Sequence, residues 1–188
     1  MMLTVLLLAI GVQAIDYASY YAKGITFADF LSKASVFADE WRDTYRHATI
    51  DDGALARARA LNGHWRLLVV ADDSCHDSVN TLPYLAKLSE AVPDTLSMRL
   101  VSSAVGQAVK AAHQTPDGRP ATPTIVVLDE RGVMKGVFIE RPAALLRYVE
   151  EHGAGKYPHQ VRDLRRHWYE EDKGRHAVAE ILDIMEGS

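Results

Sequence analysis

The chain has 188 residues, of which 48% are hydrophobic and 24% charged, and its formal net charge at pH 7 is −4. This length and composition describe one ordinary globular domain and exclude collagen-like, coiled-coil and disordered classes. A negative net charge argues against a general nucleic-acid-binding protein, which normally carries a basic excess. The single cysteine, Cys75, excludes an intrachain disulfide and any structural zinc site that needs two or more cysteine ligands. We therefore expect no metal, no cofactor and no nucleic-acid partner.

The first fourteen residues differ from the rest of the chain. Residues 3–12 are apolar except for Thr4 and Gly11, and this run is far shorter than the ~20 residues of a stable membrane span. It ends in the small-x-small sequence VQA at residues 12–14, although no Lys or Arg precedes it. We interpret residues 1–14 as a secretory signal peptide, which predicts an exported or periplasmic protein. The alternatives are a buried element of the fold or an uncleaved anchor; without cleavage, a cytoplasmic location is expected.

Residues 15–63 are predicted to form a helical extension. Apolar residues at three- and four-residue steps indicate one amphipathic helix over residues 27–45. Thr26, with Asp29 three positions later, is typical of its N-cap. A shorter helix is predicted over residues 54–61, where an Asn-Gly pair ends it.

From Trp65 the periodicity changes to that of strands, and the core is predicted over residues 64–152. Residues 67–71 are a continuous run of Leu, Val and Ala, which is typical of a central strand buried on both faces. A helix is predicted over residues 79–91. The remaining elements are a strand over 96–101, a helix over 105–112, a hairpin of strands over 125–128 and 133–139, and a helix over 144–149. The order is βαβαββα.

Residues 153–188 are predicted to be a C-terminal helical extension. They contain a basic stretch with apolar residues at helical spacing, and a further amphipathic pattern over 177–185. We interpret the basic stretch as a helix that lies on the core with its basic face in solvent, rather than as a site for an anionic partner. Its basic members are His159, Arg162, Arg165, Arg166 and His167.

The core resembles the thioredoxin family. In that family a strand–turn–helix junction carries Trp-Cys-x-x-Cys, and an x-Pro with a cis peptide bond begins the third core strand. The sequence SCHDS at residues 74–78 stands at the first place here, and Thr122-Pro123 stands at the second. The sequence is most similar to a bacterial thioredoxin-like group with a Cys-x-Asp-Ser or Cys-x-Asp-Ala site. That group shares a leading phrase like YAKGITF at residues 21–27, an Arg-Pro pair like Arg141-Pro142, and a trailing helical segment.

The resemblance implies an α/β thioredoxin fold, in which helices flank a four-stranded mixed sheet and helical extensions stand at both ends. It also implies a cis bond before Pro123 and a contact between Cys75 and Pro123 across a groove. Two departures exclude a dithiol thioredoxin. Ser78 replaces the second cysteine, so this chain cannot resolve a mixed disulfide by itself. Val69 stands where thioredoxins carry a buried Asp that handles protons for the resolving cysteine.

Cys75 is the candidate catalytic nucleophile. A thiol at the start of a helix meets unpaired backbone N–H groups and the positive end of the helix dipole, which favour the thiolate. A protonated His76 would act in the same direction, and Ser78 would donate a hydrogen bond to the sulfur. The three carboxylates of Asp72, Asp73 and Asp77 would oppose the thiolate if they lie close. The predicted substrate-binding residues are Thr122, Pro123 and Ser74.

Two functions are consistent with these residues. The first is a thiol-redox protein in which Cys75 alone forms mixed disulfides with a small thiol or a protein thiol; whether it is an enzyme, a monothiol disulfide oxidoreductase, stays open. The second is a non-catalytic thioredoxin-fold binding or scaffold module that uses the same groove. The arrangement of Ser74, His76 and Asp77 in one turn argues against a hydrolase site, because triad members converge from separate elements.

Overall fold

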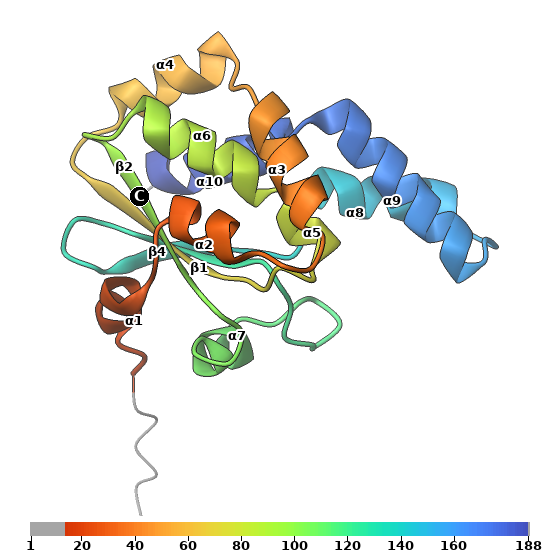
Figure 1. Ribbon diagram of the computed structural model, residues 1–188, viewed down its shortest axis with the longest axis horizontal. Coiled ribbons are helices and arrows are strands. Elements are labelled where there is room, and N and C mark those ends of the chain that lie inside the picture. The colour runs from red at the N-terminus through yellow and green to blue at the C-terminus, as the bar shows by residue number, and fades with distance from the viewer. Residues whose placement is uncertain (1–13, 188) are drawn as a thin grey trace, which may run out of the picture.

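A four-stranded sheet with strand order β2-β1-β3-β4 forms the centre of the computed structural model, which describes residues 14–187 (Figure 1). β1 (Trp65–Val70) pairs in parallel with β2 (Leu96–Val101) and antiparallel with β3 (Thr124–Leu128). β3 pairs antiparallel with β4 (Met134–Ile139). The mixed sheet and the central place of the first strand confirm the predicted fold class. All but the last residue of the predicted signal peptide lies outside the described residues.

The two central strands are buried because helices cover both faces of the sheet (Figure 1). Leu67 on one face belongs to a core cluster shared with α6 and α10. Leu68 on the other face belongs to a smaller cluster shared with α1 and α7. Both leucines are fully buried, which explains the continuous apolar run of β1. The bounds of these helices are Tyr17–Lys23 for α1, Leu82–Ala91 for α6, Gln107–Ala112 for α7 and Arg175–Glu186 for α10.

The single long helix predicted for the N-terminal extension is wrong, because two helices occur there: α2 (Phe27–Lys33) and α3 (Ala38–His47). The Asp73 carboxylate, in the loop after β1, accepts hydrogen bonds from the backbone N–H groups of Ser35 (2.7 Å) and Val36 (2.9 Å). These two N–H groups therefore bond to the Asp73 carboxylate instead of to carbonyl groups of the preceding helical turn, and the helix is interrupted here. The apolar stripe continues across the break because both helices pack against the same core cluster.

The segment between α1 and α2 covers the free edge of β2. Ile25 and Leu100 exchange two backbone hydrogen bonds of 2.9 Å, so the edge strand is paired at this point. Gly24 permits this close approach, since a Cβ at this position would lie 2.7 Å from the Arg99 Cβ.

α4 (Asp52–Ala60), which follows α3, agrees with the predicted second helix.

The helix predicted over residues 79–91 occurs as α6, which begins three residues later than predicted. A separate one-turn helix, α5 (His76–Val79), precedes it, and two residues lie between them. Pro83 explains the break: it has no backbone N–H, and in a continuous helix its ring would clash with the carbonyl group of Val79. The short α5 carries the site motif, and α6 anchors it to the core through fully buried leucines.

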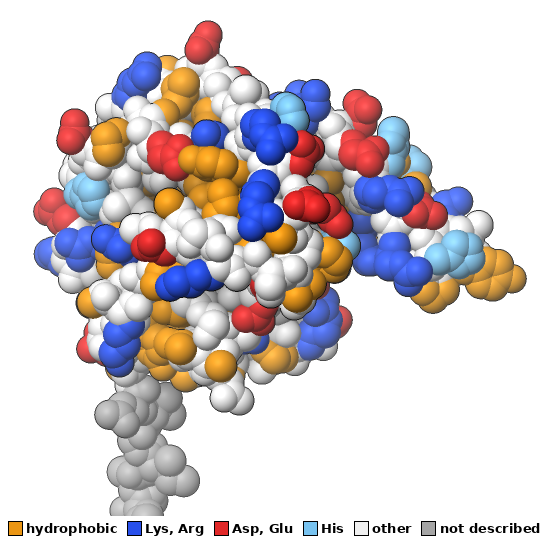
Figure 2. Space-filling view, in the orientation of Figure 1, with side chains coloured by type: hydrophobic (Ala, Val, Ile, Leu, Met, Phe, Trp, Pro, Cys, Tyr) orange, Lys and Arg blue, Asp and Glu red, His pale blue; other side chains and the backbone are white. Residues whose placement is uncertain are grey.

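The basic helix predicted within the C-terminal extension does not lie along the core, whereas α10 of the same extension packs into the main core cluster, in agreement with the amphipathic pattern predicted over 177–185. α9 (Pro158–Asp172) packs against α8 (Ala143–Gly153), and the two helices project together from the body (Figures 1 and 2). Tyr169 and Asp172, near the end of α9, are its buried residues. Its first half therefore contacts α8 rather than the sheet.

Within residues 14–187, no helix is long and apolar enough to span a membrane.

The Asp73 contact generates a prediction about pH. Hydrogen bonds from the backbone of Val36 and Ser35 lower the pKa of the Asp73 carboxyl. The Asp73 carboxylate therefore contributes fully to the free energy of unfolding above its unfolded-state pKa of about 3.9. This contribution is lost as the pH falls through the lower pKa of the folded state. We expect Asp73→Asn to reduce the free energy of unfolding at pH 7 by about 1 kcal/mol. In urea denaturation this difference should shrink toward pH 3.

The control is Asp39→Asn, whose carboxylate is exposed on α3. It should leave the free energy of unfolding almost unchanged at both pH values. An Asp73→Asn effect that is equally large at pH 3 and pH 7 would show that the carboxylate charge is not what holds the break between α2 and α3.

Candidate functional site

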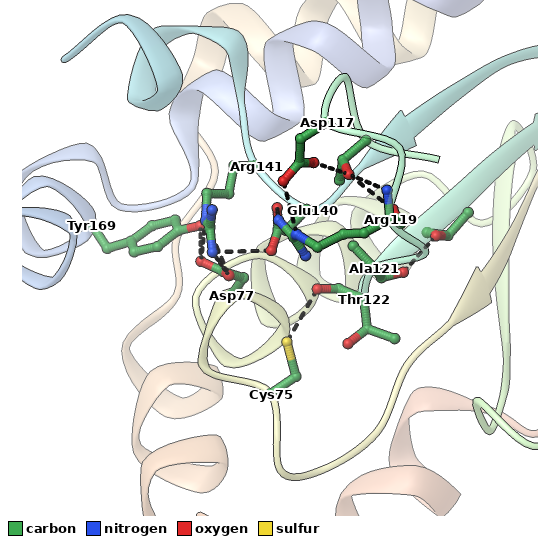
Figure 3. Close-up of polar contacts among 11 residues, drawn as sticks. Cys75, Asp77, Asp117, Arg119, Ala121, Thr122, Glu140, Arg141 and Tyr169 are labelled. Atoms are coloured by element: carbon green, nitrogen blue, oxygen red, sulfur yellow. Dashed lines mark hydrogen bonds and ion pairs between the residues drawn. The ribbon is translucent and has the colours of Figure 1, made fainter. Parts of the chain in front are cut away.

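Cys75 lies between β1 and α5 and is the N-cap residue of that helix. Its half-buried thiol Sγ donates a hydrogen bond to the Thr122 carbonyl oxygen at 3.1 Å (Figure 3). The peptide bond between Thr122 and Pro123 is cis, and Pro123 is buried directly before β3. The fold thus brings together the two segments that the resemblance singles out.

Ser78 does not have its predicted role. The residue is fully buried, and its Oγ has no hydrogen-bond partner among the described residues, so it donates no hydrogen bond to the Cys75 sulfur. Val69, the other departure from the dithiol pattern, is also fully buried, in the central strand. The position where thioredoxins hold an acid is therefore apolar core here.

His76 and Ser74, which flank the cysteine, face other surroundings. The His76 ring stacks on Phe37 with ring centroids 3.9 Å apart, and its Nε2 lies 3.8 Å from the Glu40 carboxylate. A protonated His76 would therefore be paired with an anion of α3. Ser74 is exposed at the surface.

The carboxylates that were expected to oppose a thiolate each have a partner. Asp72 accepts a hydrogen bond from the backbone N–H of Ser103 at 2.9 Å. Asp73 holds the segment between α2 and α3, as described above. Asp77 is bound by Arg141, whose guanidinium donates two hydrogen bonds from Nε at 3.1 and 3.2 Å and one from Nη2 at 2.8 Å. Their negative charges are thus partly offset within the fold.

Arg141 lies at the centre of a largely buried polar network (Figure 3). It contacts Glu140 at 3.0 Å as well as Asp77, and the three side chains are 17%, 10% and 15% exposed, respectively. Tyr169 of α9 donates a further hydrogen bond to Asp77 at 2.9 Å. Burial alone would lower the pKa of Arg141, but its hydrogen bonds and ion pairs with Asp77 and Glu140 outweigh burial and raise it. The guanidinium therefore stays charged.

Glu140 extends this network to the segment that contains the cis bond. Its backbone has a φ of 61°, in the left-handed region, and its N–H donates to the Pro123 carbonyl at 2.8 Å. Its carboxylate also accepts a hydrogen bond from Arg119 at 2.8 Å. The same network thus reaches both sides of the Cys75–Thr122 contact.

Sequence reasoning missed this network. The sequence presents Asp77 as a charge near the thiol or as a neighbour of Ser74 and His76, and it presents Arg141 as part of a family resemblance. The pairing itself carried no signal, because the partners of Asp77, Arg141 and Tyr169, lie 64 and 92 positions away in the chain. The one usable hint was the pair Glu140-Arg141, which places opposite charges directly after the last predicted strand.

An open pocket adjoins the thiol. Cys75 and Thr122 form part of its wall, and Lys110, Arg119 and Glu140 supply charges of both signs. The site therefore exposes a thiol beside polar groups that a bound molecule could contact. Within residues 14–187, no group of three or more His, Cys, Asp or Glu side chains is placed to hold a metal ion.

Comparison with known proteins agrees with this geometry. A thioredoxin family model matches residues 24–154, which is more than half of the chain, and the chain therefore belongs to the thioredoxin family. Two solved structures are similar, each with a TM-score of 0.72 and each covering 93% of this chain and 99% of the other. One is a protein of unknown function from Pseudomonas aeruginosa (22% identity), and the other is an HIV epitope scaffold (23% identity). These likenesses show the fold alone. No match was found among curated proteins.

The unpartnered hydroxyl of Ser78 generates a prediction. A buried polar group without a hydrogen bond destabilises the fold, so we expect Ser78→Ala to raise the free energy of unfolding by about 1 kcal/mol. The rate at which Cys75 reacts with iodoacetamide should stay within about twofold, because the hydroxyl does not bind the sulfur. Urea denaturation and mass spectrometry measure the two quantities. Thr81→Val, at a second fully buried and unpartnered hydroxyl, is the matched control.

Both variants should change stability in the same direction. A marked fall in Cys75 reactivity that is confined to Ser78→Ala would instead indicate that the hydroxyl serves the sulfur.

Proposed function

We propose that this protein is a thiol-redox protein that uses Cys75 as its single nucleophile and forms mixed disulfides with a small thiol or a protein thiol. The observation that carries this proposal is the position of the Cys75 sulfur, half-exposed beside an open pocket and 3.1 Å from the Thr122 carbonyl. A cysteine that served only as a packed core residue would not be expected to line an open pocket. Membership of the thioredoxin family supports the same chemistry.

The reaction has one step within this chain. The Cys75 thiolate attacks one sulfur of a disulfide R–S–S–R′, so that the bond between Cys75 and that sulfur forms while the original S–S bond breaks. The leaving thiolate R′–S⁻ takes a proton from water. The net result is one mixed disulfide and one released thiol, with no change in the total number of disulfide bonds.

Release of the adduct needs a thiol from outside the chain. Ser78 cannot attack the mixed disulfide, since its hydroxyl is neither a thiol nor in contact with solvent. A low-molecular-weight thiol would displace Cys75 by the same exchange and return it to the reduced form. Thr122 and Pro123 are proposed to line the docking edge for the group attached to the attacked sulfur.

The direct test is adduct formation. We expect the reduced protein to form a one-to-one mixed disulfide with glutathione disulfide, detected by intact mass, and to lose it when excess dithiothreitol is added. Cys75→Ser should form no adduct and should keep the fold, because the change is small and lies near the surface. Glutathione disulfide serves here as a probe of reactivity and not as the identified substrate.

The second arm concerns turnover. Wild-type protein should reduce insulin only slowly with dithiothreitol as the reductant, whereas Ser78→Cys recreates Cys-x-x-Cys and should turn over faster. The gain should be partial, because Val69 still lacks the acid of dithiol thioredoxins. If wild-type Cys75 forms no adduct and Ser78→Cys gains no reductase activity, the redox proposal fails and the non-catalytic binding module takes its place.

A further inference from the structure

The ion pair between Asp77 and Arg141 is attached to the same one-turn helix whose N-cap is Cys75. Asp77 lies two residues after Cys75 in the one-turn helix α5, and its carboxylate is 15% exposed. Arg141 reaches the same carboxylate from the turn after β4, at 2.8 Å. In a region that water reaches so little, an unbalanced charge acts over a longer distance than it would at the surface.

Among the described contacts, no other group balances the negative charge of Asp77. Tyr169 binds Asp77 as a neutral hydroxyl, because burial and the charge of Asp77 raise its pKa well above 10 and outweigh the opposing charge of Arg141. Arg119 is engaged with Glu140 at 2.8 Å. Arg141 is thus the one cation that the described contacts place on Asp77.

Other charged groups near Cys75 are screened or paired. His76 lies beside Glu40 on the exposed side of α5. Asp72 and Lys110 line the open pocket, where water screens them. Differences between variants in the alkylation rate of Cys75 should therefore report mainly on the buried pair.

We propose that the Asp77–Arg141 ion pair sets the rate at which Cys75 reacts: the positive charge of Arg141 favours the reaction of the sulfur, and Asp77 both holds the guanidinium in place and partly cancels its charge. The inference deepens the proposed function and rests on it. Arg141 is in this sense a positioning residue, because it acts on the sulfur through its charge and does not touch the reacting atoms. The two charges then act in opposite directions on the same thiol.

The test compares three variants by the rate at which Cys75 reacts with iodoacetamide, a neutral reagent, at pH 7. Arg141→Met leaves the Asp77 anion unbalanced, so alkylation should be about threefold to tenfold slower. Asp77→Asn removes that anion and leaves Arg141, so alkylation should be as fast as wild type or faster. The double variant has neither charge and should return to within about twofold of the wild-type rate.

The control is Arg57→Met. Arg57 makes a similar multidentate bridge, to Asp183 and Glu186 of α10, on a part of the fold away from Cys75. Its loss should lower the melting temperature without changing the alkylation rate. Melting temperatures of all variants separate loss of fold from loss of reactivity.

The signs of the effects decide the outcome. A purely structural ion pair predicts that Asp77→Asn and Arg141→Met change the rate in the same direction and that the double variant recovers nothing; either result overturns the inference. If Arg141→Met does not fold, Asp77→Asn alone decides, since slower alkylation contradicts the proposal and equal or faster alkylation supports it. Wild-type adduct formation with glutathione disulfide, measured beside these rates, shows separately whether the proposed function holds.

Discussion

Arg141 has to balance two carboxylates, Asp77 and Glu140, at a place that water hardly reaches. Each of the three side chains is less than one-fifth exposed, and removal of one partner from such a buried pair costs about 3–5 kcal/mol. The groups must therefore stay together in the folded protein. Because they come from α5 and from the turn after β4, and because Tyr169 joins them from α9, this requirement fixes three distant segments relative to one another. The Cys75–Thr122 contact lies between the segments so fixed.

The same constraint gives the C-terminal extension a part in the site. α9 reaches the site through its end, where Tyr169 is buried and binds Asp77. The extension thus completes a network that the central βαβαββα unit would otherwise leave open to water on one side. A thioredoxin-fold core and an added helix together build the surroundings of the thiol.

The sequence predicts the sheet well, because its signals are local. The strand over residues 96–101 has the predicted bounds, and the apolar run of β1 reports burial on both faces directly. Helix breaks are different: the break before α3 depends on Asp73, which is 38 positions from Ser35. α1 was not predicted, since it is short and contains no buried residue that would create a periodic pattern. The ion-pair network depends on contacts across the fold, which no spacing in the sequence reveals.

The fold alone does not assign an activity, because one fold supports many functions. Buried Ser78 and Val69 depart together from the dithiol pattern, and they leave Cys75 as the group on which the account depends. The most direct measurement is the iodoacetamide reaction rate of Cys75 in the native protein, divided by that of the same thiol in urea-unfolded protein at pH 7. The account predicts a ratio at or above one, because the positive charge of Arg141 favours the reaction enough to offset the partial burial of Cys75. A native thiol that reacts about tenfold more slowly than the unfolded one would contradict it.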